Sequence, residues 1–172
     1  RKIEKDIEGY LRAEDDRIMI LEGARQIGKS FIIREVGKKL YDNFIEINFA
    51  EDDEGPKIFK GIGTTEGFYF TLSSVYGEKL DRYENTLIFL DEIQHYPQYL
   101  TLLKFFREDR RFRFIASGSL LGITLRETTS IQVGSIIRKN MYQLDFEEFL
   151  IANGFGQEAL NILRTKLMNR ES

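Results

Sequence analysis

The sequence contains no cysteine and a single histidine, His95. Without cysteine, disulfides and thiolate metal sites are excluded, and one histidine excludes any metal motif that needs two. No apolar run approaches the roughly 18 residues of a membrane-spanning helix, and the N-terminal stretch lacks the uninterrupted hydrophobic region of a signal peptide. We therefore expect a cytoplasmic protein without membrane segments. His95, as the single histidine, is expected to be a surface or packing residue.

The sequence also has no strong excess of charge. Its formal net charge is -3 over 172 residues, so there is no global basic signature of a nucleic-acid-binding protein, although a local basic patch stays open. Hydrophobic residues make up 42% and charged residues 31%, the balance of an ordinary folded domain. The length suits one domain with its own core better than two.

The apolar pattern alternates between strand-like and helix-like segments. Short apolar runs predict strands at residues 18–21, 44–49, 86–90, 112–117 and 140–144. Helical spacing predicts helices at residues 2–13, 30–40, 66–80, around 99–106 and from about 155, with a long surface connection over 50–67. This alternation predicts a three-layer α/β domain with a mostly parallel central sheet.

The C-terminal stretch follows the last predicted strand. Asp145 and Glu148 have the spacing of a capping box, which predicts the start of a helix. We therefore divide the chain into a core, residues 1–145, and a helical extension, residues 146–172, as the start of a truncated further element.

Residues 23–30, GARQIGKS, match the phosphate-binding pattern G-x-x-x-x-G-K-[ST] at every fixed position, between a predicted strand and a predicted helix. Glycines let such a loop curve so that backbone N–H groups converge on a phosphate, and the following helix points its first amides at the same anion. Lys29 would reach the β- and γ-phosphates, and the Ser30 hydroxyl would ligate Mg²⁺. The predicted nucleotide-binding residues are Gly23, Ala24, Arg25, Gln26, Ile27, Gly28, Lys29, Ser30 and Phe31.

An acidic pair ends the strongest predicted strand, in the run TLIFLDE. Asp91 is placed to hold Mg²⁺, usually through water, and Glu92 to polarise the water that attacks the nucleotide. Small-molecule kinases and signalling GTPases usually lack this glutamate. The sequence also contains no N-K-x-D, the run with which GTPases read guanine, so we expect ATP as the nucleotide. The predicted catalytic residues are Glu92, Lys29 and Ser117.

Ser117 follows another strand, in the run FIASGS. In a parallel sheet that strand should lie beside the phosphate-loop strand, bringing Ser117 near the γ-phosphate or the attacking water; a turn and helix cap would explain the same residues. Hydrolysis also gains from an arginine on the transferred phosphoryl group. Arg126 and Arg138 are weak candidates, and Arg25 could instead pair with an acidic neighbour or a partner.

The runs GARQIGKS, LIFLDEIQHYP, LKFFRED, FIASGSLLGI and YQLDFEEFL together resemble a prokaryotic family of AAA-type ATPases, over residues 16–152. The resemblance implies an additional-strand P-loop core in which the FIASGS and LIFLDE strands flank the phosphate-loop strand. It also implies that Gly23, Gly28, Lys29 and Ser30 bind nucleotide, and that Asp91 and Glu92 form the Mg²⁺ and catalytic pair.

Members of that family usually continue into a winged-helix-like segment and a C-terminal domain of uncertain function, so this chain resembles an N-terminal ATPase portion. It departs from the family at IQVGSIIRKN, where a basic residue is missing after Gly134, and at Gln143, where the family has proline. The first departure weakens the assignment of an arginine finger.

Three functions follow from these residues. The leading one is an ATP- and Mg²⁺-dependent ATPase that drives a conformational change in a partner or in a missing C-terminal domain. The first alternative is an ATP-binding switch that does not hydrolyse, and the second is a kinase, for which LLGITLRETTSIQ is a poor arginine-rich lid. A protein or nucleic-acid partner is not identified by the sequence, and an arginine supplied in trans would require a homo-oligomer.

Overall fold

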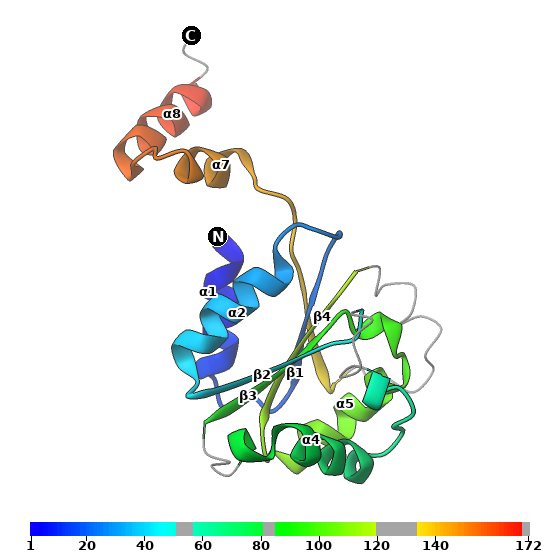
Figure 1. Cartoon of the computed structure of the whole chain (residues 1–172). Helices are drawn as coiled ribbons and strands as arrows, with labels where there is room; N and C mark the ends of the chain where they lie inside the picture. Colours follow the sequence, from blue (N-terminus) through cyan, green and yellow to red (C-terminus); the bar gives the residue numbers. More distant parts are fainter. Residues whose placement is uncertain (51–56, 81–84, 120–133, 170–172) are drawn as a thin grey trace.

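The computed structural model describes residues 1–50, 57–80, 85–119 and 134–169 (Figure 1). Its centre is a five-stranded sheet, all parallel among the described residues, in the order β2-β3-β4-β1-β5. The strands are β1 (Ile18–Glu22), β2 (Asn43–Asn48), β3 (Thr86–Asp91), β4 (Arg113–Gly118) and β5 (Ile136–Asn140). The helices are α1 (Lys2–Arg12), α2 (Lys29–Leu40), α4 (Thr65–Leu80), α5 (Gln98–Asp109), α7 (Phe146–Ala152) and α8 (Gln157–Asn169), with a short 3₁₀ helix, η1 (Ile93–His95).

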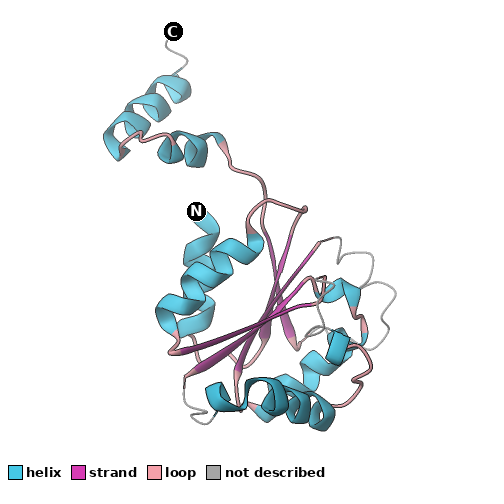
Figure 2. Ribbon diagram, in the orientation of Figure 1, coloured by secondary structure: helices cyan, strands magenta, loops and turns pink. Residues whose placement is uncertain are grey.

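Helices cover both faces of the sheet (Figure 2). Because successive side chains of a strand point to opposite faces, Met19 and Leu21 of β1 pack in one core with α1 and α2. Ile18 and Ile20 of the same strand pack in the other core with α4 and α5. All the residues of β1 and β3 are therefore buried, which explains their unbroken apolar runs. The three-layer α/β prediction is confirmed.

The last strand lies earlier than predicted. It spans residues 136–140, with Ile136 beside Ile18 and Asn140 beside Glu22, and not residues 140–144. β5 is an edge strand whose side chains are partly buried or exposed, so charged residues such as Arg138 interrupt its apolar pattern. The apolar residues that follow β5, between 141 and 144, do not form a strand, and Tyr142 among them is 74% exposed.

One of the two predicted neighbours of the phosphate-loop strand is confirmed and the other is wrong. β1 pairs with β4, which carries FIASGS, but its other neighbour is β5. β3, which carries LIFLDE, pairs with β2 and β4 and is thus separated from β1 by one strand. The prediction that LIFLDE flanks β1 is therefore wrong, because β4 is inserted between the two strands.

Helices α7 and α8 lie beyond the sheet, after the segment 141–145 (Figure 1). The capping box is confirmed, since the Glu148 backbone N–H donates to Asp145 and the Glu148 carboxylate accepts from the Asp145 N–H. The same carboxylate also accepts from the backbone N–H of Lys2, at 2.7 Å, and from Arg1. Glu148 thus joins the start of α7 to the start of α1. In the described part of the chain no helix is long and apolar enough to cross a membrane.

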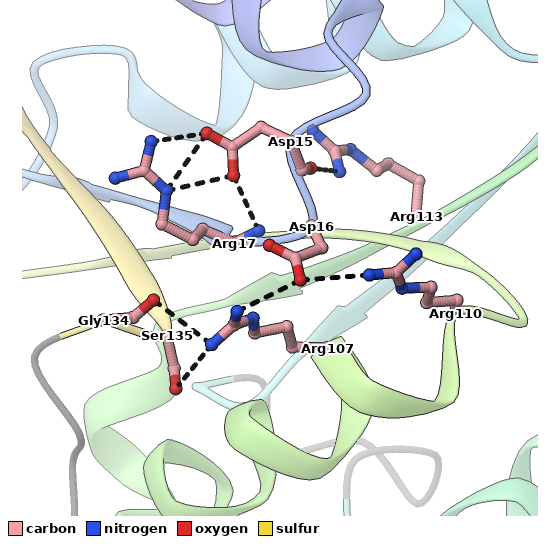
Figure 3. Close-up of polar contacts among 8 residues, drawn as sticks. All are labelled: Asp15, Asp16, Arg17, Arg107, Arg110, Arg113, Gly134 and Ser135. Atoms are coloured by element: carbon pink, nitrogen blue, oxygen red, sulfur yellow. Dashed lines mark hydrogen bonds and ion pairs between the residues drawn. The ribbon is translucent and has the colours of Figure 1, made fainter.

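Ion pairs join the amino ends of the strands (Figure 3). Asp16, just before β1, accepts from Arg107 at 3.1 Å and Arg110 at 3.2 Å, both from the end of α5. Arg107 also donates to the backbone oxygen of Gly134, at 3.2 Å, and contacts the Ser135 hydroxyl, just before β5. These contacts connect the entries of β1 and β5 to α5 at the end of the sheet away from the phosphate loop.

Candidate functional site

The phosphate loop leaves the carboxyl end of β1 and enters α2. Gly28 caps α2 in the left-handed conformation, with φ 96°, where a side chain would be strained. A Cβ on Gly23 would overlap the backbone oxygen of Met141, so this position also requires glycine. Ala24, Arg25, Gln26 and, on the first turn of α2, Phe31 are exposed around the loop.

Lys29 lies inside this loop and is only 4% exposed. Its ammonium donates to the backbone oxygens of Gly23, at 3.0 Å, and Ala24, at 2.8 Å. Burial lowers the pKa of Lys29, and the negative charges of Glu92 and Asp91 oppose that shift. The loop therefore holds a buried cation that faces the acidic pair, which is the electrostatic setting of an anion site.

Asp91 ends β3 with 2% of its surface exposed. One carboxylate oxygen accepts from the Ser30 hydroxyl of α2 at 2.7 Å, and the other accepts from the Ser117 hydroxyl of β4. Three residues far apart in the sequence thus meet at the carboxyl edge of the sheet. Carboxylate and hydroxyl oxygens are ligands of the kind that Mg²⁺ prefers. The sequence predicts Ser117 beside a phosphate or water; its contact in this structure is with Asp91.

Glu92 turns the chain away from β3 in the left-handed conformation, with φ 52°, which costs a residue other than glycine about 1–2 kcal/mol. Its Oε2 accepts from the Ser119 hydroxyl at 3.2 Å and from the side-chain amide of Gln94. That amide nitrogen also lies 3.0 Å from the Ser119 hydroxyl. No sequence motif predicts a role for Gln94, which the sequence marks only as a polar residue two positions after the acidic pair, in the run DEIQ.

A cavity of about 570 Å³ lies beside the loop. Its lining joins the phosphate loop to the segment that follows β5: Gly23, Ala24, Ile27, Asn140, Met141, Tyr142 and Gln143. Met141 is held there by its backbone N–H, which donates to the Glu22 backbone oxygen at 2.7 Å. The cavity has the size and the partly apolar lining of a small-molecule site.

Among the described residues, the arginine candidate Arg138 pairs outside this cluster. Arg138 forms a two-point ion pair with Glu22 on the neighbouring strand, at 2.5 and 2.8 Å. Arg126 lies outside the described residues. His95 is exposed at the end of η1, in agreement with a surface role.

Comparisons with known proteins agree with this fold. A family model described as an AAA domain matches residues 15–150. Among solved structures, the chain is similar to the Saccharomyces cerevisiae Hsp104–ADP complex, with a TM-score of 0.59 and 13% sequence identity over 88% of this chain and 23% of that chain. At this identity the likeness shows the fold alone, and the chain spans about a quarter of the Hsp104 chain. No curated protein matches the sequence. Because the family model covers most of the chain, the protein belongs to this family of AAA domains.

Proposed function

We propose that the protein binds ATP with Mg²⁺ at the carboxyl edge of its sheet and hydrolyses it to drive a conformational change in a partner or in a further C-terminal domain. The observation that carries the proposal is the Asp91 carboxylate bonded to the Ser30 hydroxyl, beside a phosphate loop that encloses Lys29. AAA family membership and the ADP bound by the structural neighbour support the same class of ligand.

The residues at this edge suit each part of Mg²⁺·ATP. The loop amides and Lys29 would hold the β- and γ-phosphates. Oγ of Ser30 and Oδ2 of Asp91 lie 2.7 Å apart and offer hard oxygen atoms for the metal. When bound, Mg²⁺ would offset negative charge on the phosphates. Displaced from the Gly23 and Ala24 oxygens, the Lys29 ammonium would turn to the phosphate oxygens.

The cavity beside the loop is the proposed site of the base. Ile27 and Met141 give it apolar walls, and the largely exposed Tyr142 also lines it. An aromatic ring and a thioether side chain pack well on the flat faces of a purine. This placement puts the base on one side of the loop and Glu92 at the other end of the nucleotide, where the γ-phosphate would lie.

Glu92 is the proposed general base, because it follows the metal-site aspartate and faces the same edge. The test is Mg²⁺-dependent ATP binding together with steady-state phosphate release. Lys29→Ala should abolish binding, since the loop loses its cation. Glu92→Gln should keep binding and lose turnover by about 100-fold or more. Glu35→Gln, an exposed residue on α2, is the matched control and should behave like the parent.

Three results would change the proposal. Turnover by Glu92→Gln at the parental rate would contradict the role of Glu92. Binding without phosphate release by the parent chain would favour a non-hydrolysing ATP switch. Unchanged binding in Lys29→Ala would contradict the nucleotide site itself.

A further inference from the structure

Gln94 lies where the chain turns back over the acidic pair. The left-handed backbone at Glu92 starts η1, and Ile93 between the two polar residues is fully buried. This buried anchor fixes the short helix against the sheet and carries the Gln94 side chain to the Glu92 carboxylate. The contact is therefore built by the backbone and does not depend on a freely moving surface side chain.

The orientation of the Gln94 amide follows from chemistry. Its nitrogen donates to Oε2 of Glu92 and lies 3.0 Å from the Ser119 hydroxyl, whereas a flipped amide would point its oxygen at a carboxylate. The amide oxygen is buried and has no hydrogen-bond partner within the described residues. Leaving a buried oxygen unpaired is unfavourable, so the charge-assisted bond to Glu92 is the interaction that fixes this side chain.

The two acids of the site are held in parallel ways. Ser117 and Ser119, two residues apart on the same strand-end, donate to Asp91 and Glu92 respectively. Asp91 also accepts from the Ser30 hydroxyl and from the backbone N–H of Glu92, and Glu92 also accepts from the Gln94 amide. The Ser119 hydroxyl and the Gln94 amide both donate to the same oxygen of Glu92, Oε2.

We propose that Gln94 is a positioning residue for ATP hydrolysis, which with Ser119 fixes Glu92 through Oε2 so that Oε1 receives the proton of the attacking water. The inference rests on the proposed function. In that reaction the water oxygen bonds to the γ-phosphorus, the bond from this phosphorus to the bridging oxygen of ADP breaks, and the water proton passes to Glu92. Gln94 touches none of the reacting atoms; it sets the angle from which the carboxylate meets the water.

The first test is the kinetics of Gln94→Ala. Because a small misplacement of a catalytic group costs up to about 100-fold, kcat should fall on the order of 10- to 100-fold while KM for ATP stays within about twofold of the parent value. Gln98→Ala is the matched control: it removes an amide that donates to the Lys60 backbone oxygen at 2.9 Å, and kcat should not change. A parental kcat for Gln94→Ala in a folded protein would overturn the inference.

Gln94→Glu gives a readout that a purely structural role would not move. The introduced carboxyl group can still donate to Glu92 while it is protonated, whereas two ionised carboxylates at this distance repel each other. Among the described residues, Lys29 interacts electrostatically with Glu92, Asp91 and Arg25, and the substitution leaves these charges in place. Turnover by Gln94→Glu should therefore fall as the pH rises, because the proton shared by the two carboxyl groups is lost. The parent should stay active in the same pH range. A pH profile with the parent's shape would overturn the inference.

A measurement without turnover separates this inference from the proposed function. The side-chain amide of Gln94, assigned by its loss in Gln94→Ala, should exchange slowly with water in ¹H–¹⁵N NMR spectra of the parent. Its protection should decrease in Glu92→Ala and in Ser119→Ala. Fast exchange in the parent would overturn the inference whatever the ATPase result. Protection in a parent that releases no phosphate would contradict the proposed hydrolysis alone, and Gln94 would then hold Glu92 in a non-hydrolysing site.

Discussion

The two ends of the sheet both join neighbouring strands through acidic side chains, but they compensate charge differently. At the amino end, Asp16 meets two arginine guanidinium groups, and Asp15 meets Arg17 (Figure 3). At the carboxyl end, Asp91 and Glu92 accept from hydroxyl groups and an amide, with Lys29 as the nearby cation. At the amino end, Asp15 and Asp16 are therefore paired with arginines. At the carboxyl end Glu22 is paired with Arg138, whereas Asp91 and Glu92 carry negative charge that a metal ion would offset.

A structural cluster and a candidate active site thus differ in how their carboxylates are compensated. Exposed ion pairs stabilise a fold only slightly, because water already solvates both partners. Asp91 is buried and, among the described residues, has no ion pair with a cation, and burying a charge in this way is unfavourable unless hydrogen bonds or a ligand compensate it. Substitutions at the two ends should therefore have opposite effects on stability and on nucleotide chemistry.

The largest effect is expected at Asp91. Asp91→Asn keeps the shape of the side chain but removes the charge, so ATP turnover should fall on the order of 100-fold or more. The melting temperature should not fall, because the variant no longer buries a carboxylate at the end of β3. Phosphate release and thermal unfolding without nucleotide are the two measurements. A less stable variant with parental turnover would make Asp91 structural and would remove the contrast between the two ends.

The fold was largely predictable because its main signals are local. A strand buried on both faces, such as β3, is an apolar run, and a capping box such as that of Asp145 and Glu148 lies within four residues. The phosphate loop is equally local. The pairing of β4 with β1 was predicted correctly, whereas the bounds of the edge strand β5 and the placing of β3 beside β1 were wrong. Partial burial leaves no clear sequence pattern, and strand pairing depends on residues that are distant in the sequence.

The candidate site was predictable as a set of residues and less so as a set of contacts. Sequence spacing could not show that Ser117 bonds to Asp91, since the contact needs β4 to lie beside β3. The contact between Gln94 and Glu92 needs a left-handed turn at a glutamate, and no glycine or asparagine marks it. Strained turns of this kind occur where packing overrides local preference.

A smaller effect is expected at Arg107, which connects α5 to the entries of β1 and β5. Arg107→Met keeps much of the side chain's packing and removes its bonds to Asp16 and Gly134. The melting temperature should fall by about 2–4 °C, as for other partly exposed networks in a protein of this size. ATP binding should not change. Lys104→Met, on the same helix, is the control, and weaker ATP binding in Arg107→Met alone would show that the two ends are coupled.

The smallest effect is the response of the amino end to acid. Side-chain hydrogen bonds from Arg17 lower the pKa of Asp15 from 3.8 to about 2. A lowered carboxyl pKa adds stability that is present above pH 3.8 and is lost as the pH falls through about 2. The melting temperature of the parent should thus exceed that of Asp15→Asn slightly at about pH 5, and the gap should close towards pH 2. High salt should also narrow the gap, because the pair is close to solvent. A difference in melting temperature that persisted near pH 2 would mean that Asp15 acts through packing or neutral hydrogen bonds. The ion pair with Arg17 would then not be what stabilises the amino end.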